Sequence, residues 1–155
     1  KRVTRLASGI AVIKVGGATE VEMIEKKHRV EDALEAVRSA QEEGIVPGGG
    51  TTLLKCADFV VDCEDEDQKI GVEIVRKSLQ APIRQMAINA GESPDLIVDR
   101  VTNSKDMGWD FKTAKLTMML ESGIIDPTKV TRVALQNSVS VASILVTTSN
   151  AIIEE

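Results

Sequence analysis

Three consecutive glycines, Gly48–Gly50, stand directly before a predicted helix. Glycine lets a backbone approach a ligand closely, and the first turn of a helix offers free N–H groups and a positive dipole end. This combination is compatible with nucleotide binding. The stretch lacks the spacing and the lysine of a phosphate-binding loop, and the glycines alone favour the alternative of a flexible turn.

Two aspartates are candidates for chemistry. Asp32 lies within a long predicted helix, where helical spacing places Arg29 beside it, so a solvated ion pair is the expected role from periodicity alone. A carboxylate that orients a water molecule is the functional alternative. Asp126 precedes Pro127 and is predicted to cap the last helix, with a second carboxylate oxygen available to a hydroxyl such as that of a ribose.

Composition excludes several classes of function. The net charge is −5 with no basic run, which argues against nucleic acid as a partner. One histidine and no CxxC motif leave no Cys/His metal site, and no apolar stretch is long enough to cross a membrane. Cys56 and Cys63 are expected on one helix, about 10 Å apart, as free thiols of a reducing compartment.

The N-terminal part of the chain is predicted to form one strand and one long helix. The β-branched run Ile10–Val15 is bounded by glycines and indicates a short strand. Thr19 and Glu22 have the spacing of a capping box, so a helix should begin there and continue to about Glu43, before Gly44. The glycine-rich segment after this helix indicates a boundary between a small module and a helical domain.

The rest of the chain is predicted to be mainly helical. Asp126 opens a last helix that is apolar on nearly all sides and is therefore expected to be buried. Pro82 should kink or split the helix in which it falls. The predicted helices are 51–61, a third helix that includes Ile70 and Leu79, 95–101 and 126–147, and the predicted strands are 109–113 and 151–153. The fold class is thus mainly α with a few short strands.

Several long strings, in the same order along the whole chain, resemble the large subunit of group I (GroEL-type) chaperonins. The segment Ala18–Leu34 is the most specific of them, with only short interruptions in the match. The others are Ala11–Gly16, Glu42–Gly44, Gly48–Gly50, Ala81–Gln85, Asp126–Arg132 and Ala134–Gln136.

The resemblance implies a division of the chain among three domains. Residues 1–10 would end the apical domain, residues 11–42 would be the return segment of the intermediate domain, and residues 43–155 would be the C-terminal half of a helical equatorial domain. Gly9 and Gly44 would then lie near the two hinges of the subunit.

The resemblance also implies roles for single residues. Asp32 matches the aspartate that positions the attacking water in ATP hydrolysis. Gly49, within Gly48–Gly50, matches a glycine that lies against the nucleoside, Ile124 an apolar contact to adenine, and Asp126 the acceptor of the ribose hydroxyls. Asp110, Phe111 and Lys112 occupy the adenine-contacting stretch of the family but differ from its usual small and amide residues.

The function implied is that of an ATP-dependent protein-folding subunit that hydrolyses ATP with magnesium. Its partners would be identical subunits in a ring of stacked heptamers, a small co-chaperonin and non-native polypeptides, with no nucleic acid and no membrane. It would work in the bacterial cytoplasm or in a mitochondrial or plastid matrix. The magnesium and phosphate ligands are expected in an N-terminal segment, so the fragment alone should be inactive. A non-enzymatic helical assembly module is the alternative.

Overall fold

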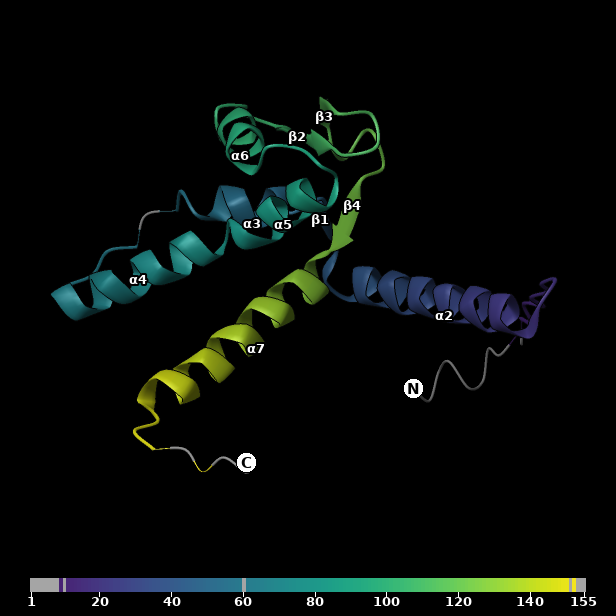
Figure 1. Ribbon diagram of the computed structural model, residues 1–155, viewed down its shortest axis with the longest axis horizontal. Helices are drawn as coiled ribbons and strands as arrows, with labels where there is room; N and C mark the ends of the chain where they lie inside the picture. The colour runs from purple at the N-terminus through teal and green to yellow at the C-terminus, as the bar shows by residue number, and fades with distance from the viewer. Residues whose placement is uncertain (1–8, 10, 60, 151, 153–155) are drawn as a thin grey trace. The chain divides into compact units, whose positions relative to one another are not determined.

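The computed structural model describes residues 9, 11–59, 61–150 and 152 (Figure 1). The chain divides into two compact units between Glu35 and Ala36. The predicted fold class, mainly α with a few short strands, is confirmed. The helices are α2 (Glu20–Glu43), α3 (Thr51–Cys56), α4 (Glu66–Ser78), α5 (Ala81–Asn89), α6 (Pro94–Thr102) and α7 (Thr128–Thr147). The strands are β1 (Ile45–Pro47), β2 (Met107–Asp110), β3 (Lys115–Met118) and β4 (Ile125–Pro127).

The strand predicted over Ile10–Val15 does not form. Residue 10 lies outside the described residues, and residues 11–15 have no regular structure. Val12 and Ile13 are 75% and 61% exposed. A strand needs a neighbour for its backbone N–H and C=O groups, and within the described part of the chain only β1–β4 and β2–β3 pair. The β-branched composition was therefore not sufficient to make this strand.

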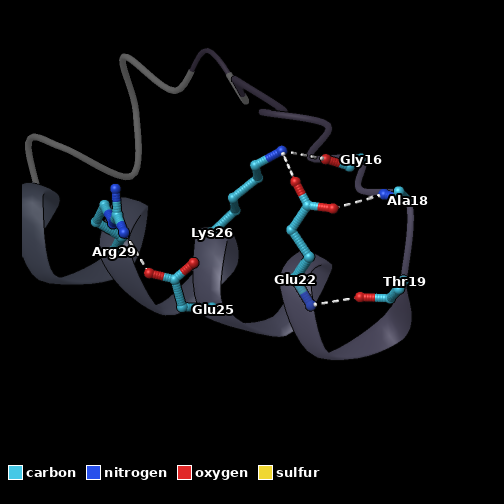
Figure 2. A network of polar contacts seen from close by, with 7 residues as sticks. All are labelled: Gly16, Ala18, Thr19, Glu22, Glu25, Lys26 and Arg29. Carbon is cyan, nitrogen blue, oxygen red and sulfur yellow. Dashed lines mark hydrogen bonds and ion pairs between the residues drawn. The ribbon is translucent and has the colours of Figure 1, made fainter.

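The predicted start of α2 is confirmed, with one difference in its hydrogen bonds (Figure 2). The Glu22 N–H donates to Thr19 Oγ1 at 3.2 Å, as in a capping box. The Glu22 carboxylate accepts the Ala18 N–H at 2.8 Å, one residue earlier than the usual box. It also pairs with Lys26 at 2.7 Å. These bonds satisfy donors at the helix start and lower the pKa of Glu22, chiefly through Lys26.

Charged side chains cover the part of α2 that lies in the first unit. Lys26, Lys27 and Arg29 each pair with a glutamate four residues away, the spacing that brings side chains together on a helix. No residue described in α2 is buried. The helix ends as predicted at Gly44, whose φ is +81° and whose N–H donates to the Ala40 carbonyl at 2.8 Å.

The core of the second unit lies between α3, α5, α6 and β2. Its buried side chains are Leu54, Ile83, Ala87, Ile97, Val101 and Trp109. The helix predicted over 51–61 stops at Cys56, and Cys63 lies in the segment beyond it, so the two free thiols are not on one helix. The predicted effect of Pro82 is confirmed, because α4 ends at Ser78 and α5 begins at Ala81 with the proline in its first turn.

Two antiparallel strand pairs complete the second unit. The strand predicted over 109–113 is confirmed only in part, because β2 ends at Asp110 and residues 111–113 form the turn that leads to β3, its partner. The β1–β4 pair joins segments far apart in sequence, with Val46 opposite Asp126. Neither strand was predicted: the segment at β1 was expected to be irregular, and the segment at β4 was expected to cap the last helix. Strands of three residues carry too little sequence pattern to be recognised.

The last helix begins and ends near its predicted limits, but it is not buried. None of the described residues of α7 is buried, and Ile144, Leu145 and Val146 are 64%, 69% and 85% exposed. The apolar composition of the helix therefore has no matching surface within the described chain. The strand predicted over 151–153 falls mostly outside the described residues. No helix in the described ranges is both long and apolar enough to cross a membrane.

Candidate functional site

The three glycines form a tight turn between β1 and α3. The Gly48 N–H donates to the Ile124 carbonyl at 2.9 Å, and the Thr51 N–H donates back to the Gly48 carbonyl at 3.2 Å. The side chain of Thr52 adds a hydrogen bond to the Pro47 carbonyl at 2.7 Å. The turn is thus fixed by hydrogen bonds on both sides, unlike the flexible turn that the glycines alone suggested.

Each glycine of this turn is needed where it stands. A Cβ on Gly48 would lie 3.1 Å from the backbone of Ile125, and one on Gly50 would lie 3.0 Å from the backbone nitrogen of Ile83. Gly49 and Gly50 also have φ of +64° and +71°, which L side chains rarely adopt. Close backbone packing therefore accounts for the glycine run even before any ligand is considered.

Asp126 on β4, and Ile124 directly before that strand, lie next to the glycine turn. Ile124 accepts the hydrogen bond from Gly48, and Asp126 is paired across the two strands with Val46. The predicted capping role of Asp126 is wrong. Pro127 is the N-cap residue of α7, and no side chain caps that helix. The cause is that β1–β4 pairing holds Asp126 in extended backbone, one position before the cap.

The carboxylate of Asp126 is half-buried and accepts no hydrogen bond from the described residues. Burial raises the pKa of Asp126, and this is the single cause of the shift. A carboxylate in such surroundings has lost part of its hydration without a replacement donor. A ligand that offers hydroxyl groups would supply those donors.

In the hairpin, the side chains of Asp110 and Phe111 make contacts within the protein. The Asp110 carboxylate accepts the Lys112 N–H at 2.9 Å and the Thr113 hydroxyl at 2.7 Å. These hydrogen bonds lower the pKa of Asp110, and the bond from the Thr113 hydroxyl has the largest effect. Phe111 packs against the core cluster, and Lys112 is exposed. The hairpin is thus built by its own side chains, which leaves little of Asp110 for a ligand.

Asp32 belongs to the first unit and is exposed on α2. The ion pair predicted between Asp32 and Arg29 is wrong, because Arg29 pairs with Glu25 one turn earlier. Lys27 likewise pairs with Glu31 at 3.4 Å. The carboxylate of Asp32 has no ion pair with any described residue, so it is available to water.

Around the predicted hinge at Gly44, two ion pairs join the end of α2 to the start of α7. Arg132 holds Glu43 in a two-pronged contact, with hydrogen bonds of 3.0 and 2.6 Å to the two carboxylate oxygens. Lys129 pairs with Glu42, and the Thr128 N–H donates to the Gly44 carbonyl at 3.1 Å. These contacts fix the β1 end of the site.

Gly9, the other predicted hinge residue, is exposed, and both hinge roles stay predictions.

The attachment of α2 to α7 should weaken in acid. Arg132 lowers the pKa of Glu43, so the contact stabilises the folded state above the ordinary glutamate pKa and this stabilisation is lost as the pH falls through the lowered value. We expect the protection of the amides at residues 40–44, taken as their exchange relative to the intrinsic rate at the same pH, to decrease between pH 5 and pH 3, roughly the glutamate range.

In an Arg132→Gln variant the same amides should exchange faster already at neutral pH and should depend less on pH. Lys77→Gln removes a positive charge from α4 that lies 4.0 Å from Glu73, and it serves as the control. Equal exchange at residues 40–44 in wild type and Arg132→Gln would contradict this prediction.

Two residues beside the glycine turn, Met119 and Thr51, were not predicted from sequence as part of the site, although each is buried with 1% exposure. Met119 follows β3 and contacts the turn, and the Thr51 hydroxyl is buried with no hydrogen-bond partner in the described structure. No sequence motif marks Met119 as a site residue. Its position becomes visible only when the hairpin and the glycine turn are brought together.

Magnesium does not fit the described residues. In the described part of the chain, no group of three or more His, Cys, Asp and Glu side chains lies close enough to hold a metal ion. Of the two predicted site aspartates in the second unit, Asp110 is already hydrogen-bonded within the hairpin. Asp126 has no hydrogen bond or ion pair with a described residue.

Comparison with known protein families gives one match that covers nearly the whole chain. The model of the TCP-1/cpn60 chaperonin family matches residues 2–155. The match includes both compact units and therefore all of the site residues discussed above.

Proposed function

This chain belongs to the TCP-1/cpn60 chaperonin family, and we propose that it supplies the nucleoside-binding half of an ATP site in a group I, protein-folding subunit. The observation that carries the proposal is the half-buried carboxylate of Asp126. It stands on β4 beside the glycine turn and accepts no hydrogen bond from the described residues.

In the proposed site, Asp126 accepts the ribose hydroxyls. Ile124 offers an apolar surface to the adenine, and the absence of side chains at Gly48–Gly50 lets the nucleoside lie against the turn. A hydrogen bond to a charged acceptor contributes about 1.5–3 kcal/mol, so Asp126 would be the strongest single contact that this chain makes.

The hydrolytic step is proposed to use Asp32. Its exposed carboxylate would accept a hydrogen bond from the attacking water and orient it toward the terminal phosphate. Rotation of the intermediate segment about Gly9 and Gly44 would bring Asp32 to the nucleotide. Phosphate and magnesium would be held by other residues of the intact subunit, which would assemble into a homo-oligomeric ring, be capped by a small co-chaperonin and enclose non-native polypeptides.

One observation favours a second candidate, a family member that kept the assembly role but lost ATP turnover. Asp110 and Phe111 are engaged within the hairpin and the core, so the adenine side of the site offers fewer free groups than the resemblance implied. ATP turnover by the intact wild-type subunit separates the two candidates, because the second would hydrolyse no ATP.

The test is Asp126→Asn in the intact subunit. Because a neutral amide replaces a charged acceptor, we expect ADP affinity to fall about tenfold. Burial raises the pKa of Asp126, so the charged carboxylate opposes folding at neutral pH and this cost disappears as the pH falls through the raised pKa. Asp126→Asn should therefore melt higher than wild type at pH 7, with a smaller difference at acidic pH.

Asp58→Asn changes an exposed aspartate after α3 and should alter neither quantity. Calorimetric titration with ADP and thermal melts at two pH values provide the measurements. Unchanged ADP affinity in Asp126→Asn, or no ADP binding by the wild type, would refute the proposed site.

A further inference from the structure

Met119 is the residue on which the parts of the proposed site converge. It directly follows β3 and is 1% exposed, so a bound ligand would not touch it. Its side chain and its backbone nevertheless contact three separate segments that carry site residues.

The side chain of Met119 fills the space that Gly49 leaves open. A Cβ on Gly49 would lie 2.9 Å from the Met119 methyl carbon, which is closer than real side chains allow. Gly49 also has a φ of +64°. The methyl group therefore packs directly against the turn at its most constrained residue.

The backbone of Met119 connects the same turn to β4. The Met119 carbonyl accepts the Ile124 N–H at 2.9 Å, and the Ile124 carbonyl accepts the Gly48 N–H at 2.9 Å. Two consecutive hydrogen bonds thus join Met119 to the first glycine, and β4, which carries Asp126, begins at the next residue.

On its other side, Met119 packs against β2. A Cβ on Gly108 would lie 2.6 Å from Met119 Cγ and 2.9 Å from its sulfur. Gly108 is two residues before Asp110, so the same side chain also sets the position of the hairpin that carries the third group of predicted contacts.

We propose that Met119 is a positioning residue for the nucleoside, which holds the glycine turn and β4 at the separation that binding requires. The inference rests on the proposed function, since it concerns the affinity of that same site. Methionine is flexible and fills irregular gaps well, and its removal would leave a cavity into which the glycine turn can move.

The test compares Met119→Ala with Met119→Leu in the intact subunit. Alanine opens the gap beside Gly49, so we expect ADP to bind about tenfold more weakly and KM for ATP to rise by a similar factor. The kcat at saturating ATP should stay within about twofold of wild type, because Met119 contacts no reacting atom. Leucine nearly conserves the volume and should restore ADP affinity to within about twofold.

Ile97→Ala is the matched control, because it truncates a fully buried core residue of α6 that is not among the nearest neighbours of the three glycines. It should lower thermal stability as Met119→Ala does, without changing ADP affinity. If Met119→Ala does not fold, Met119→Val replaces it with a smaller truncation, and an intermediate loss of affinity is expected.

Three results would overturn the role of Met119. They are wild-type ADP affinity in the folded truncation, an equal loss of affinity in Ile97→Ala, and a fall in kcat with KM unchanged. The wild type and Asp126→Asn are measured in parallel. If the wild type binds no ADP, or Asp126→Asn binds it normally, the proposed function itself fails, whereas normal behaviour of both leaves only Met119 in question.

Discussion

Replacing Asp32 with alanine in the intact subunit should reduce ATP turnover about 100-fold or more, while ADP affinity stays within about twofold. A positioned carboxylate contributes roughly 10²–10⁴ in rate when it orients or deprotonates a water. Asp32 suits this task because it is exposed and has no ion pair with the described residues, while the neighbouring cations are paired with glutamates. Single-turnover hydrolysis with saturating ATP measures the effect without interference from product release.

Glu31→Ala is the matched control for this prediction. It removes a carboxylate from the adjacent position of the same helix, and the lost pair with Lys27 is exposed and contributes little to stability. Turnover in Glu31→Ala should therefore resemble wild type, as should the helical content of both variants. Near-normal hydrolysis by Asp32→Ala would remove Asp32 from the mechanism.

The parts of the fold that could be predicted are those determined by neighbouring residues. Thr19, Glu22 and Gly44 gave the limits of α2 correctly, because helix caps depend on groups within four residues of one another. Pro82 divided α4 from α5 for the same local reason, its missing N–H and fixed φ.

Strands and burial depend on distant segments, and there the prediction failed. Residues 11–15 have a strand composition but no partner in the described chain, whereas β1 and β4 are only three residues long, each end in a proline, and do pair. Because of the same non-local pairing, Asp126 is part of a strand and does not cap α7. In α7 the apolar pattern was recognised correctly, but a pattern shows only that a surface suits burial, not that something covers it.

The candidate site divides in a similar way. Gly48–Gly50 could be predicted as a candidate site from sequence alone. The need for three glycines could not, because it comes from close contact with Met119, Ile83 and Ile125, which are distant in sequence. The roles of Asp32 and Asp126 came from family resemblance, since neither periodicity nor spacing distinguishes a catalytic aspartate from a solvated one. What the structure added is their surroundings, an unpaired exposed carboxylate and a partly desolvated one.

The largest loss of stability is expected for Gly108→Ala, a substitution of one methyl group in β2. An added Cβ would overlap the hydroxyl of Thr51 and would lie 2.6 Å from Met119 Cγ. Both neighbours are 1% exposed and cannot turn toward solvent, so the strand itself would have to shift. Overpacking of this kind costs about 1–3 kcal/mol, and we expect a value near the upper end, about 3 kcal/mol, from denaturant unfolding.

Gly71→Ala makes the identical chemical change within α4, where an added Cβ meets nothing within 4 Å. Alanine is favoured over glycine in a helix by about 1 kcal/mol, so this control should stabilise the protein or leave it unchanged. Adding Thr51→Ala to Gly108→Ala removes the nearest clashing atom, a hydroxyl that is buried without a partner in the described structure, and should restore part of the loss. If Gly108→Ala were as stable as Gly71→Ala, then β2 would not pack as closely against the turn and Met119 as the geometry requires, and the positioning role of Met119 would lose its second contact.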